Sequence, residues 1–570
     1  MSLRLTFAVF GLTLAATTAA PALADSTTYF TRSHAANLPR LLSADDRLYY
    51  GALFEAIDAQ NWDRVEVLLL QRDSGPLHGA ALAEYYLHPA SPRIPLERVE
   101  AWLAQYSASP QAEGIIRLGR TRGLENAPPL RPERQLVRQV GMSKRILPRT
   151  VEDGTMPAEL RTAILERIVA DDPDGARLLL DGIDSSLSRE ARAEWRQRVA
   201  WSYYIENRDA DAWGMANLVR EGSGAWVAEG EWVAGLAAWR LGDCDAAADG
   251  FRAAAQQSTN QELTSAARYW AGRALTRCRK PGEAQQQFRD AARYDETLYG
   301  MLALEQLGQD MPGNHATPDL TAEDWRRLES EPAVREAVML AEINRRDDAD
   351  EALRWQARRS EARDYAALTR LARALGLPAT QTFMAYNAPR GAVAPPSLRW
   401  PVAYHAPQGG WRVDPALAFA HALQESNFRE SVVSPANAIG LMQIRPIAAR
   451  EYAGSINLSA SADLKDPATN LAFGQRALEA LSRSEATRGT LPKVMAAYNA
   501  GLTPVGRWNS EVEDRDDPLL WMESIPYWET RGYVAIVMRN YWMYLRQADA
   551  PAPSRTALAQ NDWPLFPSER

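Results

Sequence analysis

Residues 232–255 read WVAGLAAWRLGDCDAAADGFRAAA, and residues 266–292 read AARYWAGRALTRCRKPGEAQQQFRDAA. In each stretch apolar residues recur at helical spacing, a short polar turn follows, and a second helix begins. Cys244 and Cys278 stand at matching positions 34 residues apart, and both second helices contain the spacing Ala-x-x-x-Phe. The two stretches therefore indicate two consecutive helical hairpins of related design.

The same alternation of helix, turn and helix extends from about residue 40 to residue 300. This spacing resembles that of tetratricopeptide-type hairpins, which bury their apolar faces only by stacking on one another. We therefore predict a fold dominated by α-helices, with an α-superhelical domain over residues 25–305; a helical domain without repeats is the alternative. The Pro- and Gly-rich stretch 387–396 marks a boundary. It separates a predicted helical linker domain, residues 306–395, from a C-terminal domain, residues 396–570.

Residues 1–24 have the pattern of a secretory signal peptide. Arg4 provides the positive charge, residues 5–14 form the apolar segment, and Ala22-Leu23-Ala24 provide the small residues of a cleavage site. The apolar segment is too short to span a bilayer, and no cysteine follows it that a lipid anchor would need. We therefore expect an exported, periplasmic protein without a membrane anchor.

The cysteine content and the net charge narrow the function classes. Because thiols pair in oxidising compartments, export favours a Cys244–Cys278 disulfide between neighbouring hairpins; the alternative is two small buried apolar residues. The chain has only 2 Cys and 6 His, so we predict no metal site and no cofactor. A net charge of −8 excludes a general nucleic-acid binder, which needs a concentrated basic face.

One helix in the C-terminal domain carries a candidate catalytic acid. Asp414-Pro415 has the pattern of a helix start, with Asp as N-cap and Pro in the first turn. The almost wholly apolar residues 416–423 follow, and Glu425 comes near the predicted helix end. An apolar setting and the negative end of the helix dipole both raise a carboxyl pKa. A Glu that stays protonated near neutral pH is what a general acid for glycosidic cleavage requires.

Four short motifs follow one another in the last third of the chain: Glu425-Ser426, then Gly440-Leu-Met-Gln443, then Ala497-Tyr-Asn-Ala-Gly501, then Glu529-Thr-Arg531. This ordered set resembles the soluble lytic murein transglycosylases. The resemblance implies a goose-lysozyme-like catalytic domain with a small β part on a ring-shaped helical platform. It also implies a substrate, the peptidoglycan glycan strand, cut between N-acetylmuramic acid and N-acetylglucosamine.

The resemblance further implies roles for individual residues. Glu425 is the single catalytic acid and base. Ser434 and Gln443 lie beside the muramoyl acetamido and hydroxyl groups, and Met442 and Tyr498 form the groove wall. Tyr498 also donates a hydrogen bond near the acid, and Asn499 and Glu529 orient the sugar or the stem peptide. Each has a structural alternative: Met442 as core, for example, and Glu529 as a first-turn charge that complements a helix N-terminus.

Most glycosidases use two carboxylates, but Glu425 is the only one to which the resemblance assigns the role of acid or base. A single carboxylate is consistent with assistance by the substrate acetamido group, which gives a 1,6-anhydro product and makes the reaction that of a lyase. A lysozyme-like hydrolase, a catalytically silent peptidoglycan-binding scaffold and a helical-repeat adaptor are the alternatives. The partners we expect are glycan strands, their stem peptides and cell-wall synthesis or remodelling proteins, with the chain itself a monomer.

Overall fold

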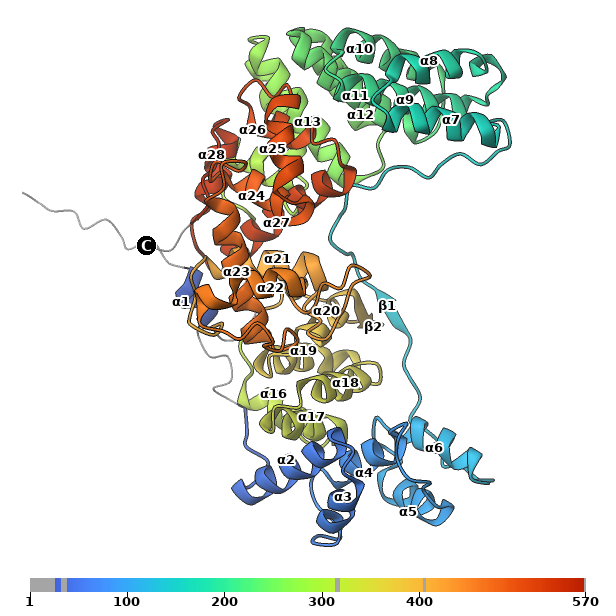
Figure 1. Cartoon of the computed structure of the whole chain (residues 1–570), viewed down its shortest axis with the longest axis vertical. Helices are drawn as coiled ribbons and strands as arrows, with labels where there is room; N and C mark the ends of the chain where they lie inside the picture. The colour runs from blue at the N-terminus through green and yellow to red at the C-terminus, as the bar shows by residue number, and fades with distance from the viewer. Residues whose placement is uncertain (1–25, 32–37, 313–317, 403–405, 568–570) are drawn as a thin grey trace, which may run out of the picture.

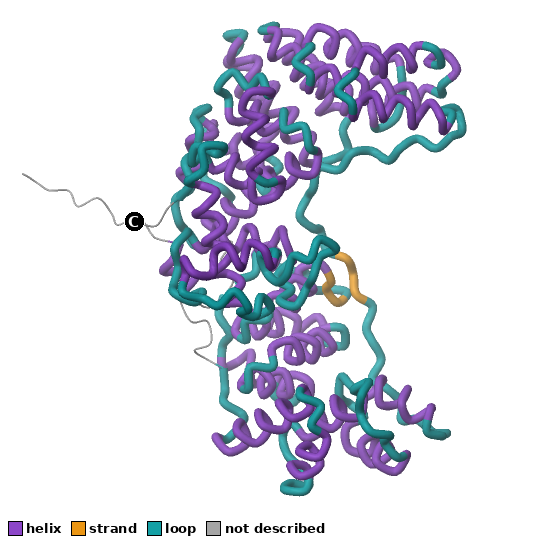
Figure 2. Tube along the Cα trace, viewed as in Figure 1, coloured by secondary structure: helices purple, strands orange, loops and turns teal. Residues whose placement is uncertain are grey.

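The computed structural model of the chain describes residues 26–31, 38–312, 318–402 and 406–567. The signal peptide predicted at residues 1–24 lies outside the described residues. The regular secondary structure of the described chain is almost entirely helical, as predicted, and the molecule is elongated (Figure 1, Figure 2). None of the described helices combines the length and the apolar character that crossing a membrane requires.

One group of helices brings together two segments that are far apart in the sequence. The first helices of the chain pack against helices from the predicted linker domain, and the two sets share one hydrophobic core. In Figure 1 these blue and olive helices lie together at one end of the molecule. The group comprises α2 (Ala44–Asp58), α3 (Trp62–Leu69), α4 (His78–Leu87), α5 (Leu96–Tyr106) and α6 (Ala112–Thr121) with α16 (Ala322–Leu328), α17 (Pro332–Glu342), α18 (Arg346–Ala357), η3 (Ala362–Asp364), α19 (Tyr365–Ala374) and α20 (Pro378–Tyr386).

A long extended segment leaves this group after α6 and runs along the molecule to α7 (Figure 2). On its way it contributes strand β1 (Leu136–Arg138), which pairs antiparallel with β2 (Asn387–Pro389). Further along, Arg145 forms ion pairs with Glu229 and with Glu523 at 3.0 and 3.1 Å. The segment therefore links both helical groups by a strand pair and by buried charges.

The second group joins the predicted superhelix to the C-terminal domain. Both parts contribute to one hydrophobic core. The superhelical part comprises α7 (Ala158–Val169), α8 (Pro173–Asp181), η1 (Asp184–Ser186), α9 (Arg189–Ile205), α10 (Asp209–Leu218), η2 (Val219–Glu221), α11 (Trp226–Leu241), α12 (Cys244–Gln257), α13 (Gln261–Arg277), α14 (Pro281–Ala292) and α15 (Leu298–Gln306). The C-terminal part comprises η4 (Pro396–Arg399), α21 (Pro415–Ser426), α22 (Pro446–Tyr452), η5 (Ala453–Ile456), α23 (Pro467–Ser482), α24 (Leu491–Ala500), α25 (Leu502–Glu511), α26 (Pro518–Glu523), α27 (Trp528–Gln547) and α28 (Pro553–Ala559), with α1 (Ser26–Thr31) against α21.

The two hairpins α11–α12 and α13–α14 repeat the same packing contact. A Cβ added at Gly235 would lie 2.5 Å from the Phe251 ring, and one added at Gly272 would lie 2.6 Å from the Phe288 ring. In both hairpins a glycine on the first helix lets the phenylalanine of the second helix reach the helix backbone. The predicted repeat is therefore present in the packing as well as in the sequence.

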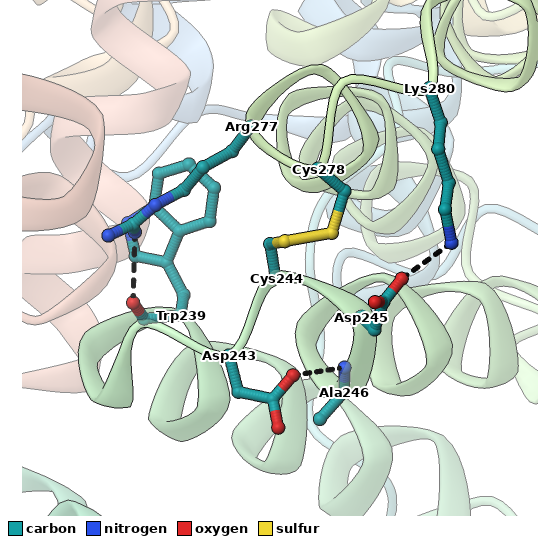
Figure 3. The surroundings of a disulfide bond; sticks show 8 residues. All are labelled: Trp239, Asp243, Cys244, Asp245, Ala246, Arg277, Cys278 and Lys280. Atoms are coloured by element: carbon teal, nitrogen blue, oxygen red, sulfur yellow. Dashed lines mark hydrogen bonds and ion pairs between the residues drawn. A yellow bond between two sulfur atoms is a disulfide. The ribbon is translucent and has the colours of Figure 1, made fainter.

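The predicted disulfide joins these hairpins (Figure 3). Cys244 begins α12, Cys278 follows the end of α13, and their Cα atoms are 5.6 Å apart. Next to the bond, Lys280 Nζ contacts Asp245 Oδ1 at 2.6 Å. Because the two sulfur atoms are bonded to each other, they are not the thiolates that a metal would need.

Candidate active site

Helix α21 carries Glu425 into the C-terminal domain. The helix begins as predicted: the Asp414 side chain accepts a hydrogen bond from the Ala416 N–H, and Pro415 occupies the first turn. It ends at Asn427, which adopts the left-handed conformation with φ 50°. Residues 415–423 are buried throughout. The helix thus presents the half-buried Glu425 from its last turn, just after a buried run.

The Glu425 carboxyl is bound by a tyrosine from the long helix α27. The Tyr533 hydroxyl donates a hydrogen bond of 2.7 Å to Glu425 Oε1. Burial raises the pKa of Glu425 to about 7; the Tyr533 hydrogen bond opposes this shift, and the charge of Glu529 adds to it. A carboxyl with this pKa is protonated in a large fraction of molecules at neutral pH, as a general acid must be.

Behind Tyr533 lies His421, one helical turn before Glu425 on α21. Its Nδ1 atom is 2.8 Å from the Tyr533 hydroxyl, and its ring lies 4.7 Å from the ring of Tyr498. Burial lowers the pKa of His421 to about 3, so the imidazole is neutral at physiological pH. His421 therefore positions Tyr533 without adding a charge to the site.

Sequence reasoning missed both of these residues. Tyr533 stands in the stretch that contains the Glu529-Thr-Arg531 motif, and His421 stands in a helix interpreted only as apolar. The available signal was spacing, because residues four apart on a helix face the same side. His421 and Glu425 form one such pair, and Glu529 and Tyr533 form another.

The Gly440-Leu-Met-Gln443 turn is held by the side chain of Asn470 on α23. Asn470 Oδ1 accepts from the Met442 N–H at 2.8 Å, and its Nδ2 donates to the Ile439 and Leu464 carbonyls at 2.8 and 2.7 Å. Gly440 has φ 76°, and a Cβ there would lie 3.0 Å from Asn470 Cγ. Only glycine fits this turn, because a side chain would be strained and would displace Asn470.

Met442 differs from its predicted position in the groove wall. Its side chain is fully buried and packs against Gly474 of α23. The Tyr498 hydroxyl donates to the Met442 carbonyl at 2.8 Å, so Tyr498 supports the turn rather than bonding to Glu425. The ring of Tyr498 is half-buried beside His421, which leaves part of it open toward the site.

Ser434 and Gln443 close the same loop from its two ends. Ser434 Oγ accepts from the Ala438 N–H at 3.0 Å, and Gln443 Nε2 donates to the Gly440 carbonyl at 2.8 Å. Both side chains are half-buried. Within the described part of the chain, Gln443 Oε1 has no hydrogen-bond partner, so it can accept a bond from a ligand.

Asn499 and Glu529 lie where the end of α24 meets the start of α27. The Thr530 hydroxyl donates to Asn499 Oδ1 at 2.7 Å, and Glu529 is exposed in the first turn of α27. Helix α27 thus contributes both Glu529 and Tyr533 beside the acid. The structure brings six of the seven predicted site residues to this region as side chains, and it contributes Met442 through its backbone.

Residues 404–520, which contain Glu425 and the Gly-Leu-Met-Gln turn, match the family model described as "Transglycosylase SLT domain". This match identifies residues 404–520 as a transglycosylase SLT domain.

The particular proteins that the chain resembles are soluble lytic murein transglycosylases. That of Escherichia coli K12 is 33% identical over 172 residues, which are 29% of this chain and 26% of the relative. A putative one of Haemophilus influenzae is 34% identical over 163 residues, 27% of each protein. The match thus spans about a quarter of the length of these relatives. The resemblance predicted from sequence is confirmed.

Solved structures extend the likeness to the whole fold. The 70 kDa soluble lytic transglycosylase in complex with bulgecin A covers 92% of this chain and 100% of its own, with TM-score 0.61 and 18% identity. Lytic transglycosylase Slt from Pseudomonas aeruginosa, solved as an inactive mutant, covers 90% of this chain and 74% of its own, with TM-score 0.52 and 20% identity. At these identities the likeness shows the fold: an α-superhelical protein with a lysozyme-like domain.

Proposed function

We propose that the chain is a lytic transglycosylase that cleaves the bond between N-acetylmuramic acid and N-acetylglucosamine in peptidoglycan. The observation that carries this proposal is the half-buried Glu425 carboxyl, with its pKa raised to about 7 and its orientation fixed by Tyr533. The export pattern of residues 1–24 supports a periplasmic location, where this substrate is found.

The reaction needs one residue that first gives and then takes a proton. Protonated Glu425 donates its proton to the glycosidic oxygen, and the C1–O bond to the leaving sugar breaks. The 2-acetamido oxygen of the muramoyl sugar attacks its own C1 and gives an oxazolinium-like intermediate. The Glu425 carboxylate then removes the proton of the C6 hydroxyl, whose oxygen attacks C1. The C1–acetamido bond breaks, a 1,6-anhydro ring closes, and no water is consumed.

The surrounding residues position these groups. Tyr533 can hold Oε1 of Glu425 in both protonation states, because its hydroxyl can donate to either. Neutral His421 fixes Tyr533 without competing for the proton. Gln443 Oε1 and the half-buried Ser434 are available to the acetamido and hydroxyl groups of the sugar, and exposed Glu529 and half-buried Asn499 border the acid on the side of α27.

Mass spectrometry of muropeptides tests the proposal. The mature protein is incubated with purified peptidoglycan, and Glu425→Gln serves as the matched control because it keeps the side-chain size. Anhydro-muramoyl ends that disappear with Glu425→Gln support the proposal. Reducing muramoyl ends would instead show a lysozyme-like hydrolase, and no release of muropeptides would favour a binding scaffold.

A further inference from the structure

A cavity of about 150 Å³ lies between the superhelix and the first turn of α27. Four tryptophans line it: Trp201 of α9, Trp226 and Trp232 of α11, and Trp528 of α27. Its volume corresponds to roughly five water molecules or one benzene-sized group. The cavity therefore fits a small apolar group rather than a sugar ring.

Arg531 also lines this cavity, and its charge is balanced only at a distance, by the carboxylates of Glu523 and Glu229 that pair directly with Arg145. The side chain is 8% exposed, and its guanidinium carbon lies 4.0 Å from the centre of the Trp201 ring and 5.0 Å from that of Trp528. Nη1 donates to the Glu523 backbone carbonyl at 3.3 Å, while Nε is buried without a hydrogen-bond partner. Among the described residues Arg531 forms no ion pair. Such a buried cation is costly unless an anion binds beside it.

The other two arginines of the cavity already have carboxylate partners. Arg145 is paired with Glu229 at 3.0 Å and with Glu523 at 3.1 Å, and Arg198 is paired with Glu194 at 2.8 Å. Burial and the neighbouring Arg145 charge lower the pKa of Arg531 to about 10, while the carboxylates of Glu523 and Glu229 oppose this shift. Arg531 therefore still carries its proton at neutral pH. Of the three arginines, Arg531 is therefore the one without a carboxylate in direct contact, and its Nε–H remains available to a ligand.

We propose that this cavity binds a carboxylate carried on a small aliphatic group, and that in the substrate this group is the carboxyl-terminal residue of a stem peptide. The identity of the ligand rests on the proposed function; the chemistry of the site does not. The guanidinium of Arg531 matches a carboxylate with two parallel N–H donors, and the tryptophan walls accept the aliphatic part.

Helix geometry connects this cavity with the acid. Trp528 and Arg531 are three residues apart on α27, and Glu529 and Tyr533 are four apart, so each pair shares a helix face. One face lines the cavity, and the other contributes to the Glu425 site. A stem peptide on a muramoyl residue at Glu425 would therefore have to pass around the first turn of α27 to reach Arg531.

Isothermal titration calorimetry on the full mature chain tests the site. The Glu425→Gln background prevents turnover, and the probes are N-acetyl-D-alanyl-D-alanine, its C-terminal amide and butyrate. We expect the dipeptide acid to bind about tenfold or more tightly than its amide, because the amide cannot form the charged pair. Arg531→Met should abolish the preference for the acid, and Arg531→Lys should retain part of it.

Arg198→Met is the matched control, because it removes an arginine of the same cavity whose charge Glu194 already neutralises. It should leave the acid-to-amide ratio unchanged. Equal binding of acid and amide, or an unchanged ratio in a folded Arg531→Met protein, would overturn the carboxylate site. Butyrate binding as tightly as the dipeptide would overturn the stem-peptide assignment. Because the readout is binding, it stands apart from the muropeptide assay: a failure of the proposed function would leave the acid-to-amide ratio intact.

Discussion

The Tyr533 hydroxyl lies 2.7 Å from Glu425 Oε1 and 2.8 Å from His421 Nδ1, so one tyrosine connects the proposed acid of α21 with a neutral histidine on the same helix. Burial alone would raise the pKa of Glu425 further; the Tyr533 hydrogen bond limits that rise. Tyr533 thus affects both the orientation of the acid and the pH at which it loses its proton.

Replacing Tyr533 by Phe should shift the alkaline limb of the pH–rate profile upward. A general acid works in its protonated form, so activity is present below the pKa of Glu425, about 7, and is lost as the pH rises through it. Without the hydrogen bond that favours the carboxylate, this pKa rises. We also expect the maximal rate to fall by about tenfold or more, because the carboxyl is no longer held in place.

Tyr541→Phe is the matched control for that measurement. Tyr541 lies on the same helix, α27, and donates to Asp414 Oδ2 at 2.8 Å, at the opposite end of α21 from Glu425. The Tyr541→Phe variant should leave the alkaline limb of the pH–rate profile unchanged. A limb that stays fixed in Tyr533→Phe, or moves equally in Tyr541→Phe, would contradict the role assigned to Tyr533.

Glu425→Gln should stabilise the protein at alkaline pH. The pKa of Glu425 is about 7 in the folded protein, against an ordinary value of 4.5. Between these values the native state holds a proton that the unfolded chain has released, so the free energy of unfolding falls as the pH rises toward 7. The loss amounts to about 3 kcal/mol once the pH exceeds the folded value. A neutral glutamine avoids this loss.

Thermal unfolding at pH 4 and at pH 8 checks this prediction. We expect Glu425→Gln to raise the melting temperature at pH 8 and to have little effect at pH 4, where the wild-type carboxyl is protonated in both states. Glu125→Gln, at an exposed loop position, is the control and should change neither value. An equal effect of Glu425→Gln at both pH values would contradict the raised pKa of Glu425 in the folded protein.

Local features of the fold were predictable from the sequence, and contacts between distant segments were not. The repeat at residues 232–292 predicted α11 to α14 and the cysteine pair, because helix periodicity and turn residues are local signals. The packing of α2–α6 against α16–α20 leaves no such signal. Periodicity shows that a helix face is buried but not which partner covers it.

The same division holds at the candidate site. The helix that carries Glu425 was predicted from Asp414, Pro415 and the apolar run after them. Helix capping and an apolar run can both be recognised from neighbouring residues in the sequence. The fully buried Met442 side chain and the hydrogen bond from Tyr533 depend on how α21, α23 and α27 meet. The motifs identified the residues of the site, while the partner of each depends on tertiary packing.

Gly474→Ala should destabilise the protein and reduce activity. A Cβ at residue 474 would lie 3.0 Å from Met442 Cβ and closer still to its sulfur, so Met442 must move. That movement shifts the carbonyl that accepts the Tyr498 hydrogen bond. We expect a loss of about 1–3 kcal/mol in the free energy of unfolding, as for other overpacked cores.

Denaturant unfolding measures the effect, with Gly214→Ala as the control. Gly214 lies on an exposed face of α10 with open space around its Cα. Alanine there should stabilise the helix by about 0.5–1 kcal/mol. If both substitutions stabilise the protein equally, the contact between Gly474 and Met442 does not constrain the turn.

Removal of the Cys244–Cys278 bond should destabilise the superhelix while leaving the chemistry intact. The bond closes a 34-residue separation, and a loop of this length contributes about 4 kcal/mol by restricting the unfolded chain. Both cysteines are half-buried, so a reductant can reach them. We expect the double variant Cys244→Ser, Cys278→Ser to have a lower melting temperature than the wild type. It should form the same anhydro products at 25 °C as the wild type, since neither cysteine lies among the residues around Glu425.

Treatment with dithiothreitol is the control. It should lower the melting temperature of the wild type to that of the double variant and leave the melting temperature of the variant unchanged. A reductant effect that persists in the variant would place its origin outside this bond.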